Sequence, residues 1–162
     1  MIKYRIKKID GVEFIFGYKD NKLIFLDISE NEEFIRKNFK GEVFEKSRDK
    51  FPAITQVNEY FQRERKVFNL DISLKGTDFQ IKTWKAISSI PFGKTKSYSE
   101  IAKDISNPKA YRAVGSAAGL NPIMIVIPCH RVTTKDYKIT GFRGGVDLKK
   151  KLLDFENEYK KK

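Results

Sequence analysis

Cysteine and histidine are the scarcest chemically useful residues in this sequence. Cys129 and His130 are the only residues of their kind among 162. A single thiol excludes an intramolecular disulfide, and one neighbouring imidazole leaves too few ligands for a zinc site made of cysteine and histidine. We therefore expect no metal. Composition leaves a magnesium site made of carboxylates open, but no acidic cluster has suitable spacing.

Long hydrophobic runs are also missing. The longest, residues 123–128, is too short to span a bilayer. The first ten residues mix charged and apolar side chains, and so they lack the apolar centre of a signal peptide. We expect a globular cytoplasmic protein with no membrane partner.

Acidic residues are few in the C-terminal part of the chain. The net charge is +12; residues 1–72 hold 15 Lys+Arg and 13 Asp+Glu, so residues 73–162 hold 18 and 8, which is +10. No acidic residue lies between Asp104 and Asp136, where four basic ones fall: Lys109, Arg112, Arg131 and Lys135. This pattern suits a polyanion such as DNA. A solvated basic surface and the lysine-rich composition of a thermophile are alternative explanations.

The N-terminal region, residues 1–75, has the pattern of a small α/β scaffold. Apolar and polar residues alternate in three runs, at residues 2–9, 12–18 and 23–28. Turn residues separate the runs, which predicts a three-stranded antiparallel meander. Helical periods in residues 30–39 and 52–68 predict helices that cover one face of the sheet. Catalytic residue types do not cluster here, so we expect a scaffold.

The C-terminal region, residues 76–162, is predicted to be mostly helical, which makes the whole chain α+β. One amphipathic helix is indicated by Phe79, Ile81, Trp84, Ile87 and Ile90. Ser99 is expected to cap a short second helix, and Asn107, followed by Pro108, to start a third that runs to Gly119. Two short helices in a basic region predict a helix-turn-helix, although helical hairpins that bind no DNA share this pattern.

The third of these helices has unusually small side chains: Ala110, Ala113, Gly115, Ser116, Ala117 and Ala118. Small residues allow close packing against a neighbouring helix. They would equally allow entry into a DNA minor groove, which is roughly 6 Å wide.

The candidate reactive group is the thiol of Cys129. Residues 123–127 are apolar and mostly β-branched, which predicts a short buried strand that leads to Cys129. A lone cysteine is usually buried and inert, but a neighbouring histidine and the missing acidic residues favour a tuned thiolate. A free thiol has a pKa of about 8.5. His130 could remove the proton through a bridging water, if its other nitrogen has an orienting acceptor.

Glu156 is the candidate acceptor. It lies near the predicted buried stripe of the last helix, which contains Leu148, Leu152, Leu153, Phe155 and Tyr159. An unpaired carboxylate there would be costly, so Glu156 is expected to face His130. An ordinary surface pair between Glu156 and a lysine fits the spacing equally well.

These residues resemble the O6-alkylguanine-DNA alkyltransferases, also called methylated-DNA–protein-cysteine methyltransferases. Pro128-Cys129-His130-Arg131 matches the family signature. Further motifs follow in order between Phe79 and Glu156: Pro91-Phe92-Gly93, Ser97-Tyr98, Asn107-Pro108-Lys109, Arg112-Ala113-Val114-Gly115, Asn121-Pro122 and Gly144-Gly145. The N-terminal region is similar only in its layout of strands and helices. The resemblance implies that this layout is ribonuclease H-like.

The resemblance implies DNA repair by an S-methyltransferase reaction that each molecule performs once. Cys129 attacks the alkyl carbon on O6 of guanine, or on O4 of alkylthymine. His130 is then the base that acts through water, Glu156 orients His130, and Asn121 supports the network. The thioether is too stable to release, no organic cofactor is needed, and we expect a monomer.

The resemblance also implies that double-stranded DNA is bound through its minor groove and the damaged base is flipped out. Arg112 then fills the gap in the base stack. Further DNA contacts are implied for Tyr98, Lys109, Ala110, Ala113, Gly115 and Ser116. The pocket for the alkylguanine is implied to contain Tyr98, Cys129, Val132, Phe142, Arg143 and Gly144.

Two positions depart from the family pattern, because some relatives have tyrosine and serine where this chain has Phe142 and Arg143. We expect Arg143 to alter which alkyl groups enter the pocket, while its backbone N–H binds guanine O6. Some relatives also have an N-terminal zinc site, which this chain cannot form from cysteine and histidine.

Two other functions compete with alkyl transfer. A helix-turn-helix regulator or a damage sensor that does not react would give Cys129 no role. A cysteine hydrolase would give the basic, slim helix no role.

Overall fold

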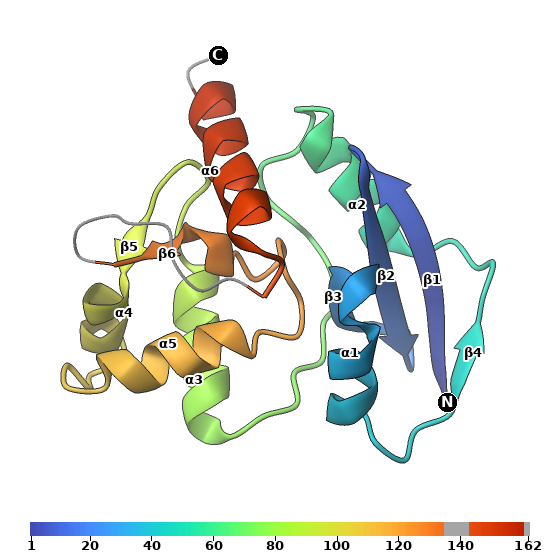
Figure 1. Ribbon diagram of the computed structural model, residues 1–162, viewed down its shortest axis with the longest axis horizontal. Helices are drawn as coiled ribbons and strands as arrows, with labels where there is room; N and C mark the ends of the chain where they lie inside the picture. Colours follow the sequence, from blue (N-terminus) through green and yellow to red (C-terminus); the bar gives the residue numbers. More distant parts are fainter. Residues whose placement is uncertain (135–142, 161–162) are drawn as a thin grey trace. The chain divides into compact units, whose positions relative to one another are not determined.

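The computed structural model describes residues 1–134 and 143–160. The chain forms two compact units, Met1–Leu74 and Lys75–Lys162. Strands dominate the first unit and helices the second, as Figure 1 shows. The predicted α+β class is therefore confirmed.

The first unit is built on the predicted antiparallel meander. It consists of β1 (Ile2–Ile9), β2 (Val12–Lys19) and β3 (Lys22–Ile28), joined by tight turns. Asp10 and Gly11 in the first turn, and Asp20 and Asn21 in the second, have positive φ, as two-residue hairpin turns require. A fourth strand, β4 (Phe44–Lys46), pairs parallel with β1 at the sheet edge. Its three residues are too few to show alternation in the sequence.

The helices of this unit cover both faces of the sheet, so the expectation of one covered face was wrong. After a 3-10 turn (η1, Ser29–Asn31), α1 (Glu32–Asn38) places Ile35 in a cluster with Ile15 of β2. The neighbouring Phe14 points to the other face and stacks on Phe61 of α2 (Pro52–Phe61), with ring centroids 6.1 Å apart. The continuous burial of β2 from Phe14 onward follows from this two-sided cover.

The second unit contains the predicted helices with shifted ends. They are α3 (Asp78–Ser88), α4 (Tyr98–Asp104), α5 (Tyr111–Gly119) and α6 (Val146–Lys160). Two short strands, β5 (Lys96–Ser97) and β6 (Val132–Thr133), pair in parallel, and β6 directly follows the 3-10 turn η2 (Cys129–Arg131). The indole N–H of Trp84 on α3 donates to the Ala117 carbonyl of α5 at 2.8 Å, which joins the buried faces of the two helices.

Two predicted helix starts were wrong. Ser97, and not Ser99, caps α4, because its hydroxyl accepts from the Glu100 N–H while the Glu100 carboxylate accepts from the Ser97 N–H. The third helix begins at Tyr111 and not at Pro108, because a turn closed by the Ala110 N–H on the Asn107 carbonyl comes first.

The expected strand at residues 123–127 was also wrong. These residues form a tight buried turn, in which the Val126 N–H donates to the Met124 carbonyl and Ile125 has a φ of 70°. Their apolar character reflects burial alone. Since the sequence signal for a buried strand and for a buried turn is the same short apolar run, periodicity could not separate the two.

We predict that Gly17→Ala destabilises the protein by about 1–3 kcal/mol, because the core is overpacked. Gly17 lies at an irregular point between β2 and β3, opposite Phe25, and a Cβ there would lie 2.2 Å from the Phe25 ring. Urea unfolding measures the loss.

Gly119→Ala is the matched control, because an added Cβ meets nothing within 4 Å at that helix end. An unchanged unfolding midpoint in Gly17→Ala would show that the Phe25 ring moves aside at little cost.

Candidate active site

The buried turn presents Asn121 to the sulfur of Cys129. The Asn121 Oδ1 accepts from the Ile123 N–H at 2.9 Å, while Nδ2 donates to the Ile127 carbonyl at 2.8 Å. The same Nδ2 lies 3.1 Å from Cys129 Sγ and donates to it. One fully buried amide therefore closes the turn and supplies an N–H to the thiol.

The 3-10 turn η2 contributes three buried residues to the site. Cys129 is buried, with 8% of its surface exposed, and His130 is fully buried. The Arg131 side chain is buried too, and its Nη1 donates to the Ile90 carbonyl at 2.7 Å. Adjacent residues of one short turn thus provide the thiol and a buried imidazole.

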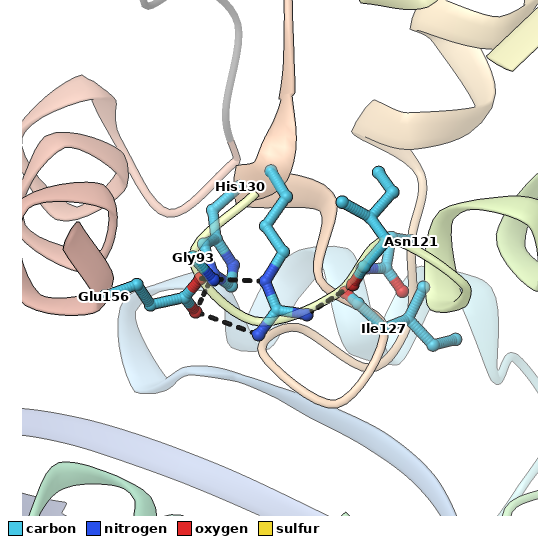
Figure 2. Close-up of polar contacts among 7 residues, drawn as sticks. Gly93, Asn121, Ile127, His130 and Glu156 are labelled. Carbon is cyan, nitrogen blue, oxygen red and sulfur yellow. Dashed lines mark hydrogen bonds and ion pairs between the residues drawn. The ribbon is translucent and has the colours of Figure 1, made fainter. Parts of the chain in front are cut away.

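Glu156 of α6 is the acceptor at the centre of this network, as Figure 2 shows for its contacts with His130 and Gly93. Its Oε2 lies 2.6 Å from His130 Nε2, and its Oε1 accepts from the Gly93 N–H at 3.2 Å. Arg131 donates to both oxygens, through Nε at 2.8 Å and Nη2 at 3.0 Å. Glu156 is only 2% exposed, so the alternative of a surface pair with a lysine is wrong.

The charges of this network are fixed by burial and by the guanidinium of Arg131. Burial raises the pKa of Glu156, but the hydrogen bonds and charges of His130 and Arg131 outweigh it and hold that pKa well below its usual value. Burial is also the main cause that lowers the pKa of His130, against the raising effect of Glu156. At neutral pH, Glu156 is therefore a carboxylate and His130 a neutral imidazole.

The tautomer of His130 follows from these charge states. A neutral imidazole beside a carboxylate acceptor carries its proton on Nε2, which leaves Nδ1 as a proton acceptor. Among the described residues, Nδ1 has no hydrogen-bond partner although it is buried. The ring therefore has a basic nitrogen that the surrounding protein does not use.

Lys149 is a member of the site that the sequence analysis missed. Its side chain is only 1% exposed, and Nζ donates to the Val132 carbonyl at 2.7 Å. Burial lowers the pKa of Lys149, and the negative charge of a Cys129 thiolate acts in the opposite direction. The helical spacing in the sequence indicates that Lys149 faces inward. Lys149, Leu152, Leu153 and Glu156 follow the i, i+3, i+4, i+7 spacing of one helix face.

The residues expected at the DNA surface lie on and before α5. Arg112, Ala113 and Ser116 are exposed, while Ala117 and Ala118 are buried in the unit. Small residues on this helix therefore occupy both its packed and its outer face. Lys109 is exposed and Ala110 half-buried in the preceding turn.

Tyr98 and Gly115 bring α4 and α5 together. Tyr98 is the first residue of α4, and its ring lies 3.8 Å from where a Cβ on Gly115 would be. Tyr111, next to Arg112, is exposed, and the Arg112 guanidinium lies 5.9 Å from its ring centroid.

The expected pocket residues are only partly described. Val132 is buried in β6, and Gly144 is half-buried before α6, whereas Phe142 lies outside the described residues. The side chain of Arg143 donates to the Gly119 carbonyl at 2.7 Å and to the Asn121 carbonyl. The guanidinium is thus directed at the end of α5.

Among residues 1–134 and 143–160, no group of three or more histidine, cysteine, aspartate or glutamate side chains could hold a metal ion. No helix in these two ranges has the length and apolar character needed to cross a membrane.

Comparison with known proteins places this geometry in a family. The family model for the DNA-binding domain of 6-O-methylguanine DNA methyltransferase matches residues 78–158. The inducible methylated-DNA–protein-cysteine methyltransferase of Bacillus subtilis is 45% identical over 130 residues, which cover 80% of this chain and 73% of that protein. The enzyme of the same name from Mycobacterium bovis is 50% identical over 104 residues, or 64% of this chain and 63% of that protein.

The similarity extends to a solved structure. OGT of Mycobacterium tuberculosis, crystallised in complex with DNA, superposes with a TM-score of 0.87 at 36% identity, and the match covers 97% of this chain and 94% of that one. With relatives this similar over most of its length, the chain belongs to the methylated-DNA–protein-cysteine methyltransferase family.

Proposed function

We propose that this chain repairs DNA by transferring the alkyl group of O6-alkylguanine, and of O4-alkylthymine, to the sulfur of Cys129. One observation carries the proposal: the only thiol of the chain accepts an N–H from Asn121 and lies beside a neutral histidine held by a buried carboxylate. A cysteine kept only for packing needs neither contact.

The reaction is a displacement at the alkyl carbon. The bond from sulfur to carbon forms as the bond from carbon to O6 breaks, O6 becomes the carbonyl of the repaired base, and a ring nitrogen of that base takes up a proton in place of the one that left the thiol. His130 Nδ1 receives the thiol proton through a bridging water, while Glu156 keeps the ring oriented and supports its positive charge. The Asn121 N–H and the buried Lys149 cation stabilise the thiolate.

The substrate is double-stranded DNA. The +10 charge of residues 73–162 attracts the polyanion, and the exposed face of α5 enters the minor groove. The damaged base leaves the stack and reaches Cys129, and Arg112 fills the gap. Tyr98, Val132, Arg143 and Gly144 surround the flipped base; Phe142 lies outside the described residues. The protein acts once, because the thioether it forms is too stable to release the alkyl group. It acts as a monomer in the cytoplasm.

A damage sensor that binds alkylated DNA without reacting is the alternative function. Alkyl transfer and damage sensing are distinguished by incubating the protein with duplex DNA that contains isotopically labelled O6-methylguanine. The protein is then digested and its peptides are analysed by mass spectrometry. Alkyl transfer gives one labelled methyl group per chain, on the peptide that contains Cys129. A bound but unlabelled protein would overturn the proposal.

We predict that Cys129→Ser abolishes alkyl transfer and keeps DNA affinity. A serine hydroxyl has a far higher pKa than a thiol and is a poorer nucleophile at neutral pH. Label transfer and fluorescence anisotropy with the same oligonucleotide measure the two properties. Transfer at the wild-type rate would mean that another residue accepts the alkyl group.

We predict that Glu156→Gln slows transfer by about 100-fold, as expected for loss of an oriented general base. The amide cannot balance the charge of Arg131 or accept equally well from His130. Single-turnover rates at saturating DNA measure the effect. Glu158→Gln, at an exposed position of the same helix, is the control for loss of one negative charge.

The same variant has a predicted pH signature in stability. A folded-state pKa below the unfolded value of 4.5 means that the Glu156 carboxylate stabilises the fold above pH 4.5, and that this contribution is lost as the pH falls further. The difference in Tm between wild type and Glu156→Gln should therefore be largest near pH 7 and shrink towards pH 3. A difference independent of pH would show that packing, and not charge, is the cause.

We predict that Arg112→Ala impairs repair of duplex DNA more than repair of a single-stranded oligonucleotide with the same lesion. The flipped base leaves a gap only in the duplex, so only there is a residue needed to fill it. Transfer rates on both substrates at one salt concentration give the ratio. Equal losses on both would make Arg112 an ordinary phosphate contact.

A further inference from the structure

Arg143 connects two parts of the second unit that have separate tasks in the proposed function. Its Nη1 donates to the carbonyl of Gly119, the last residue of α5. Its Nη2 donates to the carbonyl of Asn121, whose side chain closes the buried turn. One side chain thus spans the end of the helix proposed to contact DNA and the start of the segment that holds the thiol.

The chemistry of these two contacts favours arginine over other residues. The last carbonyls of a helix lack partners within it and form the negative end of its dipole, so a cation there is stabilising. A planar guanidinium offers two N–H groups in a fixed fork, which match the Gly119 and Asn121 carbonyls together. A lysine ammonium could reach one carbonyl but has no such fixed geometry, and serine could not span the two.

Asn121 is the link from these contacts to the reaction. Its main-chain carbonyl accepts from Arg143, and its side-chain Nδ2 donates to Cys129 Sγ at 3.1 Å. The direction of that N–H depends on how the main chain of Asn121 is held. The two carbonyl contacts of the Arg143 guanidinium thus lead to the thiol through the main chain of Asn121.

We propose that Arg143 is a positioning residue for alkyl transfer, because its guanidinium fixes the main chain at Gly119 and Asn121 so that the Asn121 amide stays aimed at Cys129. The inference rests on the proposed function and adds a residue to it. It differs from a role in selecting the size of the alkyl group and from a contact with a DNA phosphate. Each of these roles predicts a different result in one experiment.

The experiment is a double-mutant cycle of Arg143→Ala and Asn121→Ser, read as single-turnover transfer rates at saturating duplex DNA that contains O6-methylguanine. Serine keeps a short oxygen that can accept from the Ile123 N–H, but it lacks the amide that reaches the sulfur. Each single variant should lose about tenfold in maximum rate, the size expected when a reacting group is slightly misplaced. The double variant should be no slower than Asn121→Ser alone, because Arg143 acts through the missing amide.

The concentration dependence of the rate separates positioning from DNA binding. Arg143→Ala should lower the maximum rate and leave the half-saturating DNA concentration within about twofold of wild type. Arg143→Lys should recover part of the loss, since one of the two donors remains. If Arg143→Ala fails to fold, the same cycle run with Arg143→Lys decides between the outcomes.

The control for removal of a positive charge is Lys150→Ala, because Lys150 is exposed and forms an ion pair with Asp154 on the same helix. This variant should transfer at the wild-type rate. Multiplied losses in the double variant, a rise in the half-saturating DNA concentration alone, or a loss with benzylated but not methylated guanine would each overturn the inference. Absence of transfer in the wild type would instead overturn the proposed function.

Discussion

The site depends on one buried carboxylate. Glu156 lies where a negative charge would be prohibitively costly by itself, and the guanidinium of Arg131, the ring of His130 and the Gly93 N–H make it tolerable. Because Arg131 also donates to the Ile90 carbonyl, and Gly93 donates to Glu156, the same charge joins α6, η2 and the segment after α3. The contacts that fold this unit and those that orient its histidine are therefore the same contacts.

This arrangement pairs the charges of Glu156 and Arg131 with one another and not with the Cys129 thiol. Glu156 and Arg131 neutralise one another, so His130 can stay neutral although it touches a carboxylate. The charge of Lys149 acts on the thiol, and its Nζ donates to the Val132 carbonyl. A neutral base and a nearby cation are what a thiol needs to become a thiolate.

The sequence was informative where a residue has a much lower free energy in one environment than in another. The alternation in β1 to β3 and their turn residues predicted the meander, and the cost of an unpaired carboxylate near an apolar stripe predicted the pairing of Glu156 with His130. It failed where two structures bury the same side chains. Residues 123–127 form a turn and not a strand, and the paired strands β5 and β6 are too short to show a period. Lys149 was missed because a buried lysine contradicts the average behaviour of the residue, although its helical spacing pointed inward.

The left-handed backbone at Ile125 gives the turn one more property. A β-branched residue with a φ of 70° is strained, at a cost of about 1–3 kcal/mol, and the strain persists only while neighbouring contacts hold it. The Asn121 amide is one of these contacts, and it divides its N–H groups between the Ile127 carbonyl and the sulfur of Cys129. An alkylated sulfur carries no negative charge and accepts hydrogen bonds weakly. In the proposed reaction, alkylation would therefore weaken one of the contacts that hold this strained turn.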